Sequence, residues 1–105
     1  MEYVRFGTSG LKVSPLALGL GLRGQQDATE AERLIRRAFD GGINLFDCAN
    51  VYGFQDDRRH AGRSEETLGR ALKSVRDDVV ITSKVVSPIG SGPNDRSGSR
   101  YHILR

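Results

Sequence analysis

Several common signals are missing from this 105-residue sequence, and each absence narrows the class of protein. No apolar run approaches the roughly 20 residues that a membrane-spanning helix requires, so we expect no membrane segment. The first residues, Met1 to Arg5, contain no apolar stretch of the kind found in secretory signal peptides. The single cysteine, Cys48, has no partner for an internal disulfide, which favours a reducing compartment and a cytoplasmic location.

A sustained basic face is missing as well, although the formal net charge is +3. The densest charged stretch, residues 56–63, contains two aspartates that offset part of its positive charge. We interpret this stretch as a solvated loop rather than a phosphate or nucleic-acid surface, so no nucleic-acid partner is expected. With 37% hydrophobic and 28% charged residues, the chain has the composition of one soluble, globular domain.

The sequence does contain a regular alternation of strand and helix patterns. Thr29 and Glu32 have the spacing of a capping box, and an apolar stripe follows them at helical spacing. Ser64 is a good N-cap for a second helix, and Ser97 or Ser99 for the start of a third. Short apolar runs before and between these helices predict strands at residues 3–6, 12–14, 16–20, 43–47 and 79–84.

The order of these elements predicts the fold class. A hairpin over residues 3–14 is followed by β-α-β-α-β and then by the beginning of another helix. Short connections and apolar strands are typical of right-handed parallel βαβ units, so we expect an α/β fold. The segment 85–98 is rich in glycine, serine and proline, and we predict that it is a loop.

Three polar residues lie at the ends of the predicted strands. Asp47 closes the strand 43–47, Tyr52 follows five residues later, and Lys84 ends the strand 79–84. In parallel α/β folds the carboxyl ends of the strands share one edge, where ligands bind. At such an edge an ammonium group can stabilise a phenolate and a carboxylate can hold the ammonium, so the phenol can act as a general acid toward a carbonyl oxygen. Spacing alone leaves ordinary roles open: a loop cap, a packing aromatic and a surface lysine.

Five segments resemble motifs of the aldo-keto reductase family. The segment 41–53, GGINLFDCANVYG, resembles the family signature G-I-N-x-x-D-T-A-x-x-Y-G, and 78–84, DVVITSK, resembles the strand that carries the catalytic lysine. The other three are the opening hairpin at 6–14, the helix start SEETLG at 64–69 and the helix entry at 92–100. Together they cover nearly the whole chain in the family's order, and the D-x-A-x-x-Y-G element is specific.

The resemblance implies a (β/α)8 TIM barrel that binds NADPH, or less often NADH, and passes hydride to a small aldehyde or ketone. By motif, Tyr52 would protonate the carbonyl oxygen, and Lys84 would ease the release of that proton. Asp47 would pair with Lys84 and lie near the nicotinamide ribose. Gly21 and Leu22, after the first barrel strand, are the other expected cofactor contacts. The identity of the carbonyl substrate and the oligomeric state stay open.

The sequence departs from the family pattern in its length and in two local features. Only three of the eight barrel strands are predicted, and neither His60 nor His102 matches the family's catalytic histidine. We therefore expect residues 1–105 to be the N-terminal portion of a single barrel domain and to be inactive alone. Cys48 replaces the usual threonine and is expected to be a small packed residue. The connection 54–63 is longer than usual; an ordinary surface insertion is the favoured interpretation, and a loop that shapes substrate access is the alternative.

Two other functions are compatible with the same residues. A regulatory subunit of this fold, such as the potassium-channel β-subunits, would hold the cofactor with little turnover. A small self-standing α/β domain would instead bind a ligand at its strand ends and fold as a monomer. Asp47, Tyr52 and Lys84 are all present, which favours the enzyme over both alternatives.

Overall fold

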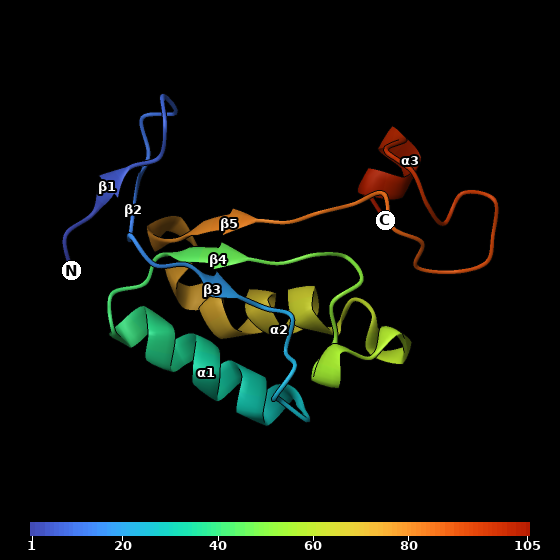
Figure 1. Ribbon diagram of the computed structural model, residues 1–105, viewed down its shortest axis with the longest axis horizontal. Helices are drawn as coiled ribbons and strands as arrows, with labels where there is room; N and C mark the ends of the chain where they lie inside the picture. Colours follow the sequence, from blue (N-terminus) through green and yellow to red (C-terminus); the bar gives the residue numbers. More distant parts are fainter.

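The polypeptide is built on a three-stranded parallel sheet whose strands alternate with two helices (Figure 1). A computed structural model describes residues 1–105. The sheet has the order β3 (Leu18–Gly19), β4 (Leu45–Asp47) and β5 (Val80–Thr82), so that β4 lies in the middle. The predicted order of elements is confirmed, but the strands are shorter than expected. Lys84 consequently lies two residues beyond β5 instead of ending it.

A separate antiparallel hairpin lies where the parallel strands begin (Figure 1). It consists of β1 (Val4–Arg5) and β2 (Lys12–Val13), as predicted from the glycines between them. Gly7 and Gly10 have positive φ angles of 59° and 83°, which glycine adopts without a side-chain clash. The hairpin is therefore remote from the carboxyl ends of the strands.

The first helix, α1 (Ala28–Asp40), begins earlier than its sequence pattern suggests. Asp27 is the N-cap and accepts a hydrogen bond of 3.0 Å from the backbone nitrogen of Glu30. The carboxylate of Glu30 accepts one of 2.8 Å from the backbone nitrogen of Gln26. The capping box predicted at Thr29 and Glu32 is therefore wrong, because a related arrangement two residues upstream takes its place, in which the glutamate reaches the residue before the N-cap.

The second helix, α2 (Arg63–Leu72), also starts before its predicted cap. Gly62, with a φ of 89°, precedes the helix in the left-handed region that favours glycine. Ser64 lies inside the first turn and is buried, so the prediction that it caps the helix is wrong. The chain continues through a 3-10 segment, η3 (Lys73–Asp78), into β5.

The hydrophobic core lies between the sheet and the two helices. Figure 1 shows α1 and α2 on the same side of the sheet. Side chains alternate along a strand, and Phe46 and Cys48 accordingly join the core while Asp47 does not. No helix in the chain combines the length and the apolar character needed to cross a membrane. The buried core consists of Leu20, Leu22, Ala31, Ile35, Phe46, Cys48, Leu68, Ala71, Leu72 and Val79.

Two long connections leave the carboxyl ends of the strands. The connection after β4 contains two 3-10 turns, η1 (Phe54–Asp56) and η2 (Arg58–His60). The connection after β5 has no regular element before the short helix α3 (Arg100–Ile103), as predicted for a loop. Ser99 caps α3, which decides between the two serines proposed from the sequence.

Candidate active site

The parallel strands bring the three predicted catalytic residues to one edge of the sheet. Asp47 is the last residue of β4 and stands opposite Thr82, the last residue of β5. Side chains two residues apart on a strand share a face, so Lys84 follows Thr82 on the side of Asp47. Tyr52 lies in the loop that leaves β4. The core covers the opposite face, so this constellation points away from the helices.

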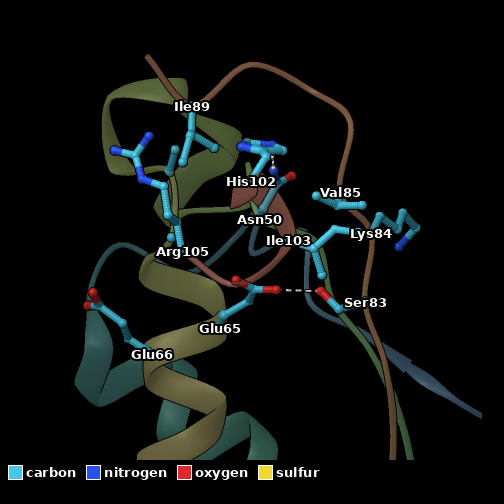
Figure 2. Close-up of a pocket in the computed structure, with 12 residues that line it drawn as sticks. Asn50, Glu65, Glu66, Ser83, Lys84, Val85, Ile89, His102, Ile103 and Arg105 are labelled. Atoms are coloured by element: carbon cyan, nitrogen blue, oxygen red, sulfur yellow. Dashed lines mark hydrogen bonds between the residues drawn. The ribbon is translucent and has the colours of Figure 1, made fainter. Parts of the chain in front are cut away.

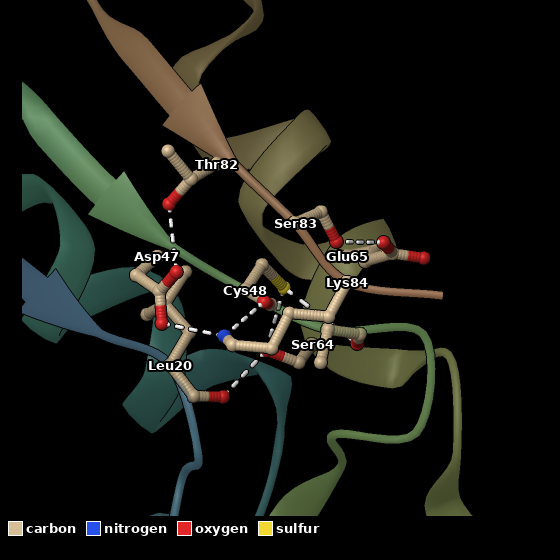
Figure 3. A network of polar contacts seen from close by, with 9 residues as sticks. Leu20, Asp47, Cys48, Ser64, Glu65, Thr82, Ser83 and Lys84 are labelled. Atoms are coloured by element: carbon tan, nitrogen blue, oxygen red, sulfur yellow. Dashed lines mark hydrogen bonds and ion pairs between the residues drawn. The ribbon is translucent and has the colours of Figure 1, made fainter. Parts of the chain in front are cut away.

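Asp47 is held by two neighbours through different oxygens (Figure 3). The Lys84 ammonium donates to Oδ2 at 2.6 Å, and the Thr82 hydroxyl donates to Oδ1 at 2.7 Å. Together, the hydrogen bond from Lys84 and then that from Thr82 hold the pKa of Asp47 below its ordinary range, against the opposing effect of burial. The carboxylate is therefore charged and fixed in orientation at neutral pH.

Lys84 makes three contacts that fix its ammonium group. Besides the Asp47 carboxylate, Nζ donates to the carbonyl oxygen of Cys48 at 2.7 Å and lies 4.9 Å from the centre of the Tyr52 ring. Partial burial lowers the pKa of Lys84, but its contacts with Asp47 and Tyr52 more than offset this, and the net direction is upward. The amine is thus a permanent cation beside a phenol ring.

Tyr52 is positioned by the backbone on both sides of its loop. Its nitrogen donates to the carbonyl of Ala49 at 3.2 Å, and its carbonyl accepts from the nitrogen of Ser64 at 3.2 Å. The nitrogen of Asn50 donates to the carbonyl of Lys84 at 3.1 Å. The loop that carries the phenol is therefore tied to both α2 and the chain beyond β5.

A buried polar cluster beneath the site joins three elements (Figure 3). The Ser64 hydroxyl donates to the carbonyl of Leu20 at 2.6 Å, and the Cys48 sulfur lies 3.2 Å from the same hydroxyl oxygen. A serine hydroxyl has one proton, and the hydrogen bond to the Leu20 carbonyl uses it, so the Cys48 thiol is the donor in the second contact. Burial raises the pKa of the Cys48 thiol. The prediction that Cys48 is a small packed residue is confirmed by its complete burial.

A hollow of about 400 Å³ opens beside Asp47 and Tyr52. Both residues predicted from the sequence as further cofactor contacts, Gly21 and Leu22, line it as well. A Cβ atom built on Gly21 would meet nothing within 4 Å, so the space beside this glycine is open. Leu22 is buried in the core, and its carbonyl oxygen accepts from the backbone nitrogens of Gln25 at 3.3 Å and Gln55 at 2.8 Å, so this residue shapes the wall of the hollow. The whole lining is Gly19, Gly21, Leu22, Arg23, Gly24, Gln25, Asp47, Tyr52 and Asp56.

Neither histidine lines that hollow. His60 belongs to η2, where its ring packs on Phe54 with centroids 5.7 Å apart. His102 is buried and borders a second hollow of about 510 Å³ beneath the loop before α3, together with Asn50 and Lys84 (Figure 2). Its Nε2 lies 3.5 Å from the side-chain nitrogen of Asn50. The structure therefore brings Asp47, Tyr52 and Lys84 together but adds no histidine to them.

Sequence reasoning missed two side chains that organise the site. Thr82 fixes the free oxygen of Asp47, and its signal was its position two residues before Lys84 on the same strand face. Ser64 bonds to the carbonyl of Leu20, which is 44 residues away in the sequence. No local pattern predicts such a long-range contact, and the pattern around Ser64 predicted a helix cap instead.

Comparison with known proteins gives matches along almost the whole chain. The model of the aldo/keto reductase family matches residues 6–105. A probable voltage-gated potassium channel subunit beta from rice (Oryza sativa subsp. japonica) is 39% identical over 99% of this chain and 31% of its own length. L-glyceraldehyde 3-phosphate reductase of Escherichia coli (strain K12) is 38% identical over 99% of this chain and 30% of its own length. The chain thus spans about a third of the length of these relatives.

A solved structure gives the same result for the fold. The holo form of an aldo-keto reductase from Bacillus halodurans matches with a TM-score of 0.77 and 31% identity, over 98% of this chain and 33% of that chain. The predicted α/β fold is confirmed, and it corresponds to the N-terminal part of that protein's barrel.

Proposed function

Because this chain belongs to the aldo/keto reductase family, we propose that the full-length protein reduces small aldehydes or ketones to alcohols with NADPH, or alternatively NADH. The observation that carries the proposal is Lys84, whose ammonium contacts the Asp47 carboxylate at 2.6 Å and lies over the ring of Tyr52. A phenol beside a fixed cation is a suitable proton donor for a carbonyl oxygen. The buried thiol of Cys48 suits the reducing cytoplasm, where we place the protein.

In this proposal Tyr52 gives its proton to the carbonyl oxygen while hydride adds to the carbonyl carbon. The phenolate left on Tyr52 is stabilised by the ammonium of Lys84. Asp47 keeps that ammonium in place, and Thr82 keeps Asp47 from turning away. Proton and hydride together convert the carbonyl to an alcohol, and solvent then returns a proton to Tyr52.

The hollow beside Tyr52 fits one end of a nicotinamide cofactor. At about 400 Å³ it has room for a ring and a sugar, but not for a whole dinucleotide. The open space at Gly21 allows close approach, Leu22 forms part of the wall, and Asp47 can accept from a sugar hydroxyl. When bound, the cofactor supplies the hydride. The protein's part is to orient the carbonyl and to deliver the proton.

The test is Tyr52→Phe in the full-length protein, assayed by NADPH oxidation with a reactive aldehyde such as 4-nitrobenzaldehyde. Loss of the proton donor should lower kcat/KM by about 10² to 10⁴. Tyr101→Phe is a matched control, because Tyr101 is exposed on α3 and borders neither hollow. Equal activity of the Tyr52→Phe variant and the wild type would overturn the proposed role.

We further propose that residues 1–105 by themselves do not reduce carbonyls. The hollow accommodates only part of the cofactor, and neither His60 nor His102 lines it beside Tyr52. The 105-residue chain should therefore show no NADPH oxidation with an aldehyde that the full-length protein reduces. Turnover by the chain alone that disappears in Tyr52→Phe would contradict this.

A regulatory subunit is the second candidate function. The observation that favours it is the 39% identity to the probable potassium channel β-subunits of rice and Arabidopsis thaliana. Such a protein would bind the cofactor and complete one reduction, but would turn over slowly. Steady-state and single-turnover measurements on the full-length protein separate the two, because only an enzyme sustains many cycles with a small aldehyde.

A further inference from the structure

Two loops meet across the mouth of the hollow that contains Tyr52. The backbone nitrogen of Gln55, after β4, donates to the carbonyl oxygens of Leu22 at 2.8 Å and of Gln25 at 3.1 Å, after β3. Beside this clasp, the Arg23 guanidinium lies 3.4 Å from the Asp56 carboxylate. Both members of this ion pair line the hollow, so it forms part of the wall that a ligand meets.

Where these two loops meet, three residues have an unfavourable backbone conformation. Leu22, Gln55 and Asp56 have φ angles of 51°, 57° and 56°, in the left-handed region that residues other than glycine seldom occupy. Burial of the Leu22 side chain in the core holds the first of them in place. Strain of this kind accumulates where function requires a particular geometry. Arg23 follows Leu22 directly and Asp56 follows Gln55, so both members of the ion pair are carried on backbone of this conformation.

Arg23 is the only cationic side chain that lines the hollow. The charge of Asp47 is already matched by Lys84, so it does not compete for Arg23. Asp56 does compete, but the pair is highly exposed, with side-chain exposures of 84% and 53%. Ion pairs this exposed contribute little, so an incoming anion can take the place of Asp56. The planar guanidinium can receive a carboxylate through two hydrogen bonds.

We propose that Arg23 is a specificity-determining residue that favours carbonyl substrates bearing an anionic group, with Asp56 as its partner in the absence of substrate. The inference rests on the proposed carbonyl reduction at Tyr52. In it the substrate lies outside the space assigned to the cofactor, with its carbonyl oxygen at the phenol and its anionic group toward Arg23. Arg23 acts on binding and orientation and takes no part in the transfer of hydride or proton.

The test compares two aldehydes of similar shape, 4-carboxybenzaldehyde and the neutral 4-nitrobenzaldehyde, with the full-length protein. Arg23→Met should lower the ratio of their kcat/KM values (carboxylate over neutral) by about threefold to tenfold. Asp56→Asn should raise that ratio, because the competing carboxylate is gone. Arg59→Met is the matched control: it removes an equally exposed arginine, paired with Asp57, that does not line the hollow, and it should leave the ratio unchanged.

The outcomes separate this inference from the function on which it rests. Reduction of neither aldehyde by the wild type overturns the proposed function and the inference together. Reduction of both, with the same ratio in wild type and Arg23→Met, overturns the inference alone. If Arg23→Met raises the Kd for NADPH but leaves the ratio unchanged, the inference is overturned too, because the arginine would then bind a cofactor phosphate. The preference should shrink at high salt, because exposed charges are screened.

Discussion

Replacing Lys84 with methionine tests the site most directly, because stability and catalysis should respond very differently. The substitution keeps most of the side-chain length but removes the ammonium. The hydrogen bonds of 2.6 Å to Asp47 and 2.7 Å to the carbonyl of Cys48 disappear, as does the charge 4.9 Å from the centre of the Tyr52 ring. Thr82 still holds the other oxygen of Asp47, so the carboxylate keeps one anchor.

The expected loss of stability is small. The side chains of Lys84 and Asp47 are 48% and 39% exposed, and solvent screening limits such pairs to about 1 kcal/mol or less. The melting temperature of the full-length protein should therefore fall by no more than about 4 °C. The expected loss of activity is much larger: if the ammonium activates the proton donor, kcat/KM should fall at least about 100-fold, or about 2.7 kcal/mol of activation free energy.

Thermal unfolding and NADPH oxidation on the same preparations measure both quantities. Lys73→Met is the control, because Lys73 is exposed at the start of η3, borders neither hollow and forms none of the ion pairs. A Lys84→Met variant that melts normally and keeps more than about a tenth of wild-type kcat/KM would refute the reasoning. So would a variant that unfolds easily but is fully active while folded, since that would make the lysine a structural residue.

Asp47→Asn should flatten the decline of thermal stability in acid. The folded-state pKa of Asp47 is lowered, so its contribution is complete above about pH 4 and is lost as the pH falls through the folded-state value; melts of the wild type and variant that fall in parallel below about pH 4 would contradict this. Gly53→Ala should cost at least about 2 kcal/mol, because the new Cβ would lie 2.1 Å from the carbonyl oxygen of His60; an unchanged denaturation midpoint would show that the two loops separate easily. Asp27→Ala should lower the free energy of unfolding by about 1 kcal/mol, because the helix loses its cap, and Thr29→Ala should lower it by less than about 0.5 kcal/mol. If chemical denaturation gave the larger loss for Thr29→Ala, the capping box at Thr29 and Glu32 would be favoured instead.

The sequence was sufficient to predict the order of elements and the edge at which the site forms. Strand and helix patterns alternate clearly, and parallel strands place Asp47 and Lys84 at the same edge whatever their loops do. The position of Tyr52 followed from its distance to Asp47 in the same loop. These features depend on the periodicity of short segments and on the order in which the segments follow one another, and both can be read directly from the sequence.

Helix starts and side-chain partners were harder to predict, for a physical reason. Asp27 and Thr29 are both good caps with a glutamate three residues later, and the energies of such alternatives differ by less than a local pattern can resolve. The Ser64 hydroxyl donates to the carbonyl of Leu20, and the Thr82 hydroxyl donates to Asp47, which is 35 residues away in the sequence. Contacts of this range depend on the assembled sheet and cannot be read from neighbouring residues.

The three-residue strand β4 carries a consequence for anyone who transplants or redesigns this site. Phe46 is fully buried against the helices, and the next residue, Asp47, holds Lys84 on the opposite side. A register slip of one residue would exchange the two faces, placing the carboxylate in the oily interior and the phenyl ring at the catalytic edge. A substitution at Phe46 that changes how β4 packs can therefore change the orientation of Asp47 as well as the stability of the core. A graft that transfers Asp47 and Lys84 without Phe46 would omit the buried residue that sets which face of the strand the carboxylate occupies.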